Sequence, residues 1–220
     1  SWGVFGELNI PIVKDLETTL SARHDHYSDF GNANTGKLAF RWKLGSNALL
    51  RGSVGSGFHA PTVPQVAAAP QPFGVTSDKY TCTPGLAAEA AAQGATCRPG
   101  SQQYDVVAAG NPLLKPEKSK QATIGFRVDP VNWLSAGADL WWVGVKDVFG
   151  QLPERTVFDN PTQYPGSWTK AVDVGTGATY LAFNQGNLNL GKSYSTGLDI
   201  DISARNSTPW GRLDTRFNMT

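Results

Sequence analysis

Apolar and polar residues alternate along most of this chain, over one strand length after another. Between Lys37 and Leu44, for example, leucine, phenylalanine and tryptophan alternate with lysine and arginine. Successive strand residues point to opposite faces of a sheet, so each such segment has one apolar face and one charged face. The pattern predicts an all-β, antiparallel protein. We expect strands at about residues 3–12, 16–30, 36–44, 47–58, 119–129, 132–148, 178–189, 194–205 and 211–220.

Connections of two kinds separate these strands. Irregular segments rich in alanine, proline and glycine fill about 59–118 and 149–177. Short turns at one end of the strands and long loops at the other are typical of outer-membrane β-barrels. We therefore expect the two long segments to be extracellular loops. Short turns are predicted at 31–36, 45–46, 129–132 and 207–211.

A soluble β-sandwich would also alternate, with its apolar face in a core and its polar face in water. Two features favour a transmembrane barrel. The polar faces carry both signs of charge in dense rows, as expected in a water-filled or plugged lumen. Aromatic residues also gather near strand ends, where an interfacial girdle would lie. On this interpretation Leu38, Phe40 and Trp42 face lipid. The girdle candidates are Trp2, Tyr27, Phe30, Phe58, Trp133, Phe149 and Trp210.

Charge and hydropathy restrict the possible partners. The 19 basic residues nearly balance the 18 acidic residues, which gives no electrostatic reason to expect nucleic acid or an anionic membrane surface as a partner. No apolar run approaches the roughly 18 residues of a membrane-spanning helix, but this does not exclude a membrane protein, because barrel strands are only half apolar. The first residues do not resemble a signal peptide, and the last ones read as an interrupted strand. Because open sheet edges are untenable in lipid, we expect a fragment of a larger closed barrel.

Several segments carry a family resemblance. Leu50–Thr62 reads LRGSVGSGFHAPT, and Asn111–Ser119, at the end of the first long loop, reads NPLLKPEKS. Together with FGELNIPI at 5–12, SARHDHYSDFG at 21–31, and NQG at 184–186 before STGLD, they resemble the barrel of TonB-dependent outer-membrane receptors. His24, His59 and Asp199 depart from the residues usual in that family, so the resemblance implies no role for these three side chains.

The resemblance implies a fold and a mechanism. The family builds a 22-strand barrel, of which these residues would supply about nine strands, as a partial barrel domain over 1–220. It implies an N-terminal plug domain and a TonB box, which these residues do not contain. Outside loops would bind a scarce nutrient, and energy would arrive through TonB. Receptors for siderophores, cobalamin, oligosaccharides and peptides share this kind of barrel, so the resemblance does not identify the nutrient. The implied partners are outer-membrane lipid, the nutrient, the receptor's own plug and TonB; no enzyme activity and no cofactor are implied.

Two other functions remain open at this point. A soluble extracellular β-sandwich that binds carbohydrate would fold alone, and its apolar faces would meet in a sealed core. A passive porin would differ from a receptor by lacking a plug.

The first long loop contains Cys82 and Cys97, the two cysteines of the chain. An even pair in a surface loop indicates a disulfide. Metal binding is the alternative, but it requires more ligands than this segment supplies. Between the cysteines, Leu86–Gln93 consists largely of strong helix formers and is followed by Gly94. We expect a short helix there; a low-complexity coil is the alternative.

The second long loop offers candidate ligand contacts in Phe158, Tyr164, Trp168 and Asp173. Aromatic rings beside polar groups suit stacking on sugars or other cyclic nutrients. They suit packing of the loops on one another equally well.

Charged residues on the predicted strands are interpreted as rows that line a lumen and contact the plug. Acid–base catalysis would require a carboxylate pair in a dry cleft, which a wet lumen does not provide. His24 and His26 would share one strand face while Asp25 points to the other, so no metal site is expected. The predicted lumen charges are Arg23, Asp25, Arg41, Arg51, Arg127, Asp199, Asp201 and Arg205.

Overall fold

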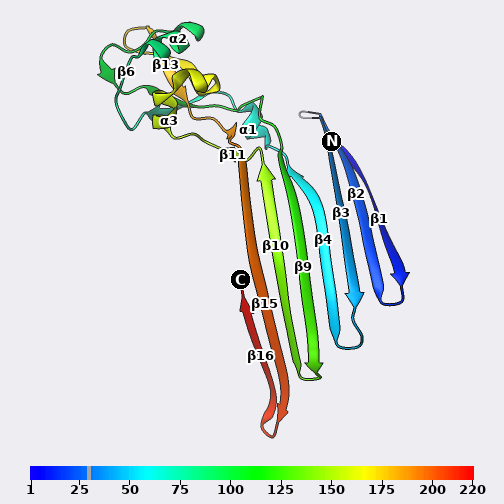
Figure 1. The fold of residues 1–220 in the computed structure, drawn as a ribbon. Helices are drawn as coiled ribbons and strands as arrows, with labels where there is room; N and C mark the ends of the chain where they lie inside the picture. Colours follow the sequence, from blue (N-terminus) through cyan, green and yellow to red (C-terminus); the bar gives the residue numbers. More distant parts are fainter. Residues whose placement is uncertain (29–30) are drawn as a thin grey trace. The chain divides into compact units, whose positions relative to one another are not determined.

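The computed structural model describes residues 1–28 and 31–220 and divides them into two compact units. We call Ser1–His59, Pro116–Asp147 and Gly191–Thr220 the wall unit, and Ala60–Lys115 with Val148–Leu190 the loop unit. Figure 1 shows that the wall unit is made of long strands, whereas the loop unit mixes short strands with helices. The girdle candidate Phe30 lies outside the described residues.

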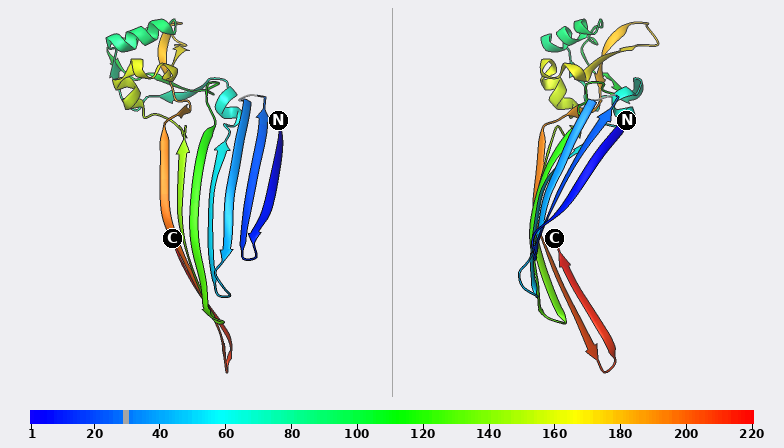
Figure 2. Two further views of the ribbon diagram at one scale, coloured as in Figure 1. Left: turned by 45° about the vertical axis from the view of Figure 1, so that its right-hand side comes forward. Right: turned by 90° about the vertical axis from the view of Figure 1, so that its right-hand side faces the viewer.

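The wall unit is one eight-stranded antiparallel sheet whose strands follow chain order. The views in Figure 2 show these strands side by side in a twisted sheet, as the chirality of the backbone requires. The all-β, antiparallel prediction is confirmed. The strands are β1 (Trp2–Val13), β2 (Leu16–Tyr27), β3 (Gly31–Lys43), β4 (Ala48–His59), β9 (Glu117–Val131), β10 (Leu134–Lys146), β15 (Lys192–Thr208) and β16 (Gly211–Met219).

One predicted turn is wrong. The segment 31–36 has the composition of a turn, but it forms the first half of β3 and pairs with β2 from Tyr27 opposite Gly31 onward. Its asparagines find partners across the strands: Asn34 Oδ1 lies 2.6 Å from His24 Nδ1, and Asn32 Oδ1 lies 2.8 Å from His26 Nδ1. These cross-strand bonds satisfy side chains that would otherwise favour a turn.

The loop unit contains a small four-stranded sheet of its own, in the order β12-β13-β8-β5. The prediction that residues 178–189 form a wall strand is wrong, because β13 pairs with β12 and β8 in this sheet. The described wall therefore has eight strands rather than nine. The loop-unit strands are β5 (Gln71–Val75), β6 (Tyr80–Thr81), β7 (Ser101–Gln102), β8 (Asp105–Ala108), β11 (Phe149–Gly150), β12 (Trp168–Val172), β13 (Thr179–Asn184) and β14 (Leu188–Asn189).

Short helices complete the loop unit: α1 (Val63–Ala67), α2 (Pro84–Ala92), α3 (Glu154–Asp159), η1 (Pro161–Gln163) and η2 (Pro165–Ser167). The predicted helix between the cysteines is α2. Thr83 caps it by accepting a hydrogen bond from Leu86 N at 3.3 Å, and Gly94, with φ of +64°, follows its end. Within the described residues, no helix has the length and apolar character needed to cross a membrane.

Candidate functional site

The wall sheet places most of its described charged side chains on one face. Residues paired across strands point to the same face, so the register defines rows that run across the sheet. We call the side that bears Arg41 and Arg51 the charged face, and the side that bears Leu38 and Phe40 the apolar face. One row of the charged face runs through Glu17, Arg41, Arg51, Gly125, Asp139 and Asp199.

Arg51 and Asp139 form an ion pair across an intervening strand. Arg51 lies on β4 and Asp139 on β10, and between them Gly125 of β9 has no side chain. The guanidinium donates two hydrogen bonds to the carboxylate, from Nε at 2.9 Å and from Nη2 at 2.5 Å. A Cβ on Gly125 would lie 1.8 Å from Asp139 Oδ1. The bridge therefore requires glycine at this position.

The same arrangement recurs one strand further along. Arg127 of β9 lies 3.6 Å from Asp201 of β15, across Gly137 of β10. A Cβ on Gly137 would lie 2.4 Å from Asp201 Oδ1. Sequence reasoning identified the charges but missed these glycines. A glycine at a charged-face position between an arginine strand and an aspartate strand is the signal that could have revealed them.

All eight predicted lumen charges point to the charged face, as their register shows. Arg23 pairs with Asp25 at 2.7 Å, and Asp25 is buried over Gly3. Arg41 lies 3.9 Å from Glu17, and Arg205 lies 3.7 Å from Asp214. Asp199 stands opposite Asp139, and its buried Oδ1 has no partner within the described residues. That these charges line a lumen stays a prediction.

The apolar face is exposed and, over its middle, uncharged. Between the row of Trp142 and the row of Leu134, none of its described residues is charged. Ile124 is 51% exposed and Leu140 is 56% exposed, although both lie on interior strands. No second sheet of the described residues covers this face to form the sealed core that a β-sandwich needs.

His24 and His26 also lie on the apolar face, where they flank the ring of Trp2 at centroid distances of 5.5 and 5.6 Å. Asp25 points to the other face, as expected. The described residues contain no cluster of three or more side chains suited to hold a metal ion.

In the loop unit, two of the four candidate ligand contacts are core residues. Phe158 and Trp168 are each 4% exposed, and their rings meet edge to face at 5.0 Å. Tyr80 stacks on Phe158 at 3.8 Å, and Trp168 Nε1 donates to Pro161 O at 2.9 Å. These rings pack the loops against one another, which was the alternative to ligand contact. Ligand contact by them stays a prediction and would require this core to open.

The other two candidates lie at the edge of that core. Tyr164 is partly buried against it. Asp173 closes a turn by accepting hydrogen bonds from Thr176 N at 3.0 Å and Gly175 N at 3.1 Å, and it lies 3.7 Å from Arg98. The hydrogen bonds from Thr176, foremost the one from its backbone, hold the pKa of the Asp173 carboxyl below its usual value.

Two polar clusters of the loop unit were not anticipated from the sequence. Arg98 donates to Asp105 at 2.7 Å, and its guanidinium carbon lies 4.7 Å from the centre of the Tyr180 ring. Glu154, at the start of α3, accepts hydrogen bonds from the backbone of Ser77 and Asp78 and from the Tyr80 hydroxyl. Burial is the main reason that the pKa of Tyr80 is raised. Both clusters join segments distant in sequence, which no local pattern reveals.

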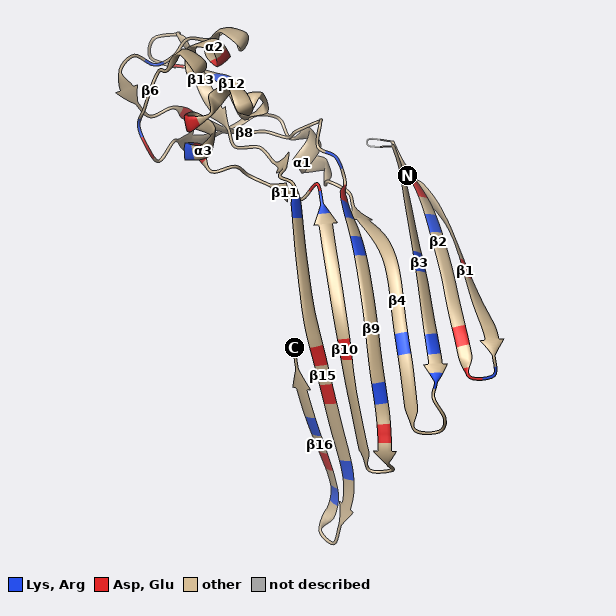
Figure 3. Cartoon of the chain, viewed as in Figure 1, with Lys and Arg blue, Asp and Glu red and all other residues tan. Residues whose placement is uncertain are grey.

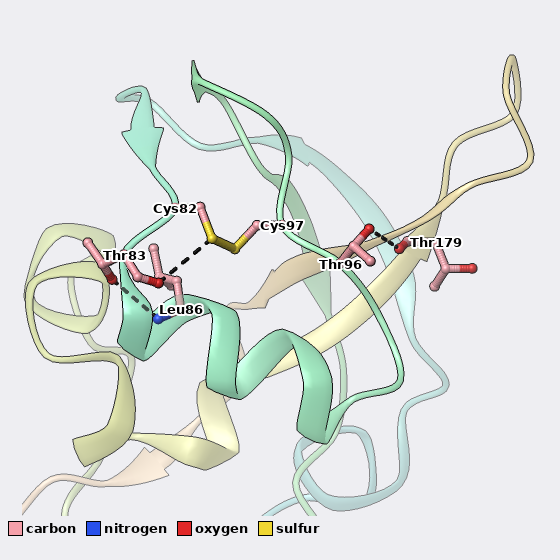
Figure 4. Close-up of a disulfide and its surroundings, with 6 residues drawn as sticks. All are labelled: Cys82, Thr83, Leu86, Thr96, Cys97 and Thr179. Carbon is pink, nitrogen blue, oxygen red and sulfur yellow. Dashed lines mark hydrogen bonds between the residues drawn. A yellow bond between two sulfur atoms is a disulfide. The ribbon is translucent and has the colours of Figure 1, made fainter.

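The predicted disulfide is present. Cys82 and Cys97 are bonded, with their Cα atoms 5.8 Å apart (Figure 4). Cys82 precedes α2 and Cys97 follows it, so the bond closes the segment that contains the helix. Beside it, Thr96 is held to β13 by a hydrogen bond from its hydroxyl to Thr179 O at 3.3 Å, which Figure 4 also shows.

The ends of β4 and β9, where the chain leaves and re-enters the wall, contain the segments whose motifs were singled out in the sequence. His59 and Glu117 pair there, with His59 Nδ1 2.9 Å from Glu117 Oε2. A family model described as "TonB dependent receptor-like, beta-barrel" matches residues 1–220. The chain belongs to this family.

Solved structures of TonB-dependent receptors share this fold at low sequence identity. The siderophore receptor PirA from Acinetobacter baumannii aligns with 98% of the chain at 17% identity and a TM-score of 0.66, over 27% of its own length. The ferric enterobactin receptor PfeA aligns with 99% of the chain at 16% identity and a TM-score of 0.62, over 26% of its length. The RagAB peptide importer aligns with 98% at 18% identity and a TM-score of 0.58, over 21% of its length.

The chain thus spans about a quarter of the length of these proteins. At such identities the likeness concerns the fold of the TonB-dependent receptor barrel alone. A comparison of the sequence with curated proteins found no match.

Proposed function

We propose that this chain forms part of the barrel wall and outside loops of an outer-membrane receptor for the active uptake of a scarce nutrient. In this proposal the apolar face of the wall unit contacts lipid and the charged face lines the lumen. The loop unit forms extracellular loops. The plug domain and TonB act as partners of the complete receptor.

The partition of charge between the two faces carries the proposal. Both signs of charge crowd the charged face, while the middle of the apolar face has none among the described residues. A sheet in water would gain nothing from keeping Ile124 and Leu140 exposed, whereas lipid is a favourable solvent for them. In Figure 3 the charges form coloured bands along the strands, with both colours in the sheet.

The ligand class is set by the loops rather than by the wall. Proteins with this fold are named as siderophore receptors and as a peptide importer, so the wall is common to different cargoes. The loop unit, with its own packed core and disulfide, offers a rigid support for a binding surface. Tyr164 and Asp173 at its edge are the candidate contacts that are not fully buried. We expect the charged face to hold the plug reversibly through its arginines and carboxylates.

Charging one face at a time tests the membrane assignment. Ile124 and Thr123 are neighbours on β9 that point to opposite faces. In the full-length receptor, Ile124→Arg should destabilise the barrel by about 2–4 kcal/mol, the penalty for arginine facing the bilayer midplane. Thr123→Arg is the matched control: it adds the same side chain on the lumen face and loses one hydrogen bond, to Ser53 at 2.8 Å.

The readout is the heat-modifiable, folded fraction in isolated outer membranes and its midpoint of unfolding in urea. Equal stability of the two variants would overturn the lipid-facing assignment. Nutrient uptake that persists in cells lacking TonB would favour a passive porin instead, even if the membrane assignment held.

A further inference from the structure

Among the described residues, the apolar face of the wall carries charge at one end only, and every charged residue there is lysine. Lys118, Lys146 and Lys192 occupy a single row: Lys146 of β10 stands opposite Lys118 of β9 on one side and opposite Lys192 of β15 on the other. Lys120 lies one row further into the sheet on the same face. We call the first three the lysine row. All three are exposed, and Figure 3 shows the blue bands at the loop ends of these strands.

Nothing in the described part of the protein neutralises the lysine row. No carboxylate of the described residues forms an ion pair with any of the three. Two carboxylates are adjacent to the row in the sequence: Glu117 points to the charged face and pairs with His59, and Asp147 lies beyond the end of β10. Like charges directly opposite each other on neighbouring strands destabilise a sheet. Because Lys146 stands opposite a lysine on both sides, the row favours the binding of an external anion that carries more than one negative charge.

The height of the row along the strands matches the level of lipid headgroups. Leu140 lies midway along β10 between Leu134 and Lys146. At about 3.4 Å per residue and a tilt of about 40°, the six residues from Leu140 to Lys146 rise about 15 Å along the barrel axis. An apolar band about 25 Å tall extends only about 12 Å from its middle, so the lysine row lies just beyond it.

Aromatic side chains mark the boundary immediately inside the row. Tyr194 stands in the row of Lys120, and it is 79% exposed. Gly144 lies between them on β10, and a Cβ there would lie 2.7 Å from the ring of Trp142. The indole therefore leans over the glycine toward the lysines. Tyrosine and tryptophan at the polar edge of an apolar band are typical of a membrane interface.

From these observations we propose that the lysine row binds the phosphate groups of a phosphorylated lipid in the outer leaflet, on the outside of the barrel. The acyl chains of that lipid would lie along the apolar face beneath Tyr194 and Trp142. The nearly balanced net charge of the chain concealed this surface, because the lysines on one face are offset by carboxylates on the other. The inference rests on the membrane placement proposed above but is independent of the nutrient.

The experiment compares three forms of the full-length receptor, purified from outer membranes in mild detergent and checked for heat-modifiable folding. The first carries Lys118→Gln, Lys146→Gln and Lys192→Gln. The charge-matched control carries Lys14→Gln, Lys37→Gln and Lys43→Gln, which lie in a turn or on the charged face. A third form replaces the lysine row with arginine, which keeps the charge. The probe is lipid A with two phosphates, measured by native mass spectrometry.

Each lysine near an anionic surface contributes about a factor of five, so the glutamine triple should bind the probe roughly a hundred-fold more weakly. The control and the arginine form should bind like the wild type, and raising the salt concentration should weaken all binding. Equal affinity of the glutamine triple, or equal affinity for lipid A stripped of its phosphates, would overturn the proposal. If the receptor still fractionates with the outer membrane in that case, its membrane placement stands and only the lysine row is refuted.

Discussion

The wall unit and the loop unit bury their apolar side chains in opposite ways. Every large apolar residue that the described structure buries belongs to the loop unit, with Leu86, Tyr104, Val157 and Leu181 at its centre. The wall unit has longer strands, yet most of its leucines and isoleucines stay exposed on one face. The loop unit is therefore organised like a small water-soluble domain, stabilised by a core and a disulfide. In the proposed membrane placement, the wall unit depends on backbone pairing and on lipid as its apolar solvent.

Polar groups follow the same division. In the wall, ion pairs repeat across strands in a regular lattice over glycines. In the loop unit, Arg98 and Glu154 each join segments that no sheet register aligns. The comparison shows that one chain uses periodic pairing in a sheet with an exposed apolar face and irregular packing in a unit with a core of its own. Three variants and a change of pH, in order of decreasing effect, test it.

Removing the central ring of the loop core should have the largest effect. Phe158→Ala should destabilise the loop unit by about 3–5 kcal/mol, as is usual for a buried phenylalanine, because Tyr80 and Trp168 lose the ring they pack against. Hydrogen exchange should increase across 80–108 and 152–184 while the wall strands stay protected. Phe158→Leu is the control and should have a smaller effect. Equal loss of protection in the wall would show that the two units do not unfold separately.

Opening the disulfide should have a somewhat smaller effect, in the same unit. The Cys82–Cys97 bond spans a sequence separation of 15. Replacing both residues by serine should lower the stability of the loop unit by about 3 kcal/mol, mainly because its unfolded state gains entropy. Limited proteolysis of the receptor measures this loss of stability. Cleavage within 83–96 should increase in the serine variant, or in the wild type after reduction, and the wall should stay resistant. Unchanged cleavage would mean that the core alone holds α2.

Replacing the glycine between Arg51 and Asp139 should lower the free energy of unfolding of the wall by about 1 kcal/mol, the usual scale of an exposed ion pair. Gly125→Val places atoms where the Asp139 carboxylate lies, so Arg51 loses its partner. Afterwards Arg51→Gln should have no further effect, whereas in the wild type it should. Gly6→Val is the control, because nothing lies within 4 Å of a Cβ at that position. Urea midpoints of the folded barrel provide the double-mutant cycle, and full additivity would contradict the bridge.

Acidification should produce the smallest and most local effect. The pKa of Asp173 is lowered in the folded state, so its carboxylate stabilises the turn above the unfolded value of about 3.9. That contribution is lost as the pH falls through the lower folded pKa. Amide exchange at Gly175 and Thr176, corrected for intrinsic rates, should therefore increase below about pH 4. Asp173→Asn should remove most of this pH dependence; if it does not, another group controls the turn.

Local patterns in the sequence were sufficient for much of this fold. The alternation in β3, β15 and β16 identified the strands and correctly assigned their faces, because a period of two leaves only two directions for a side chain. The cysteine pair and the alanine-rich segment predicted the disulfide and α2, since both depend on neighbours close in the chain. Assigning the eight charged residues to one face required only that alternate residues of a strand point to the same side.

Which sheet a strand joins was decided by tertiary structure. Residues 179–184 read as a wall strand, but Leu181, Ala182 and Phe183 are buried by β12, β8 and the loop core. Alternation does not specify the partner, because the partner lies far away in the sequence. For the same reason Phe158 and Trp168 read as exposed loop aromatics and prove to be core residues.

By itself, then, the sequence determined most strands, their faces, the disulfide and α2, because those follow from the geometry of residues close in the chain. The register between strands was decided only in three dimensions. That register brings Arg51 to Asp139 over Gly125 and aligns three lysines that are separated by loops along the chain. Both arrangements depend on pairing between distant segments, which is a property of the folded sheet and of no single strand.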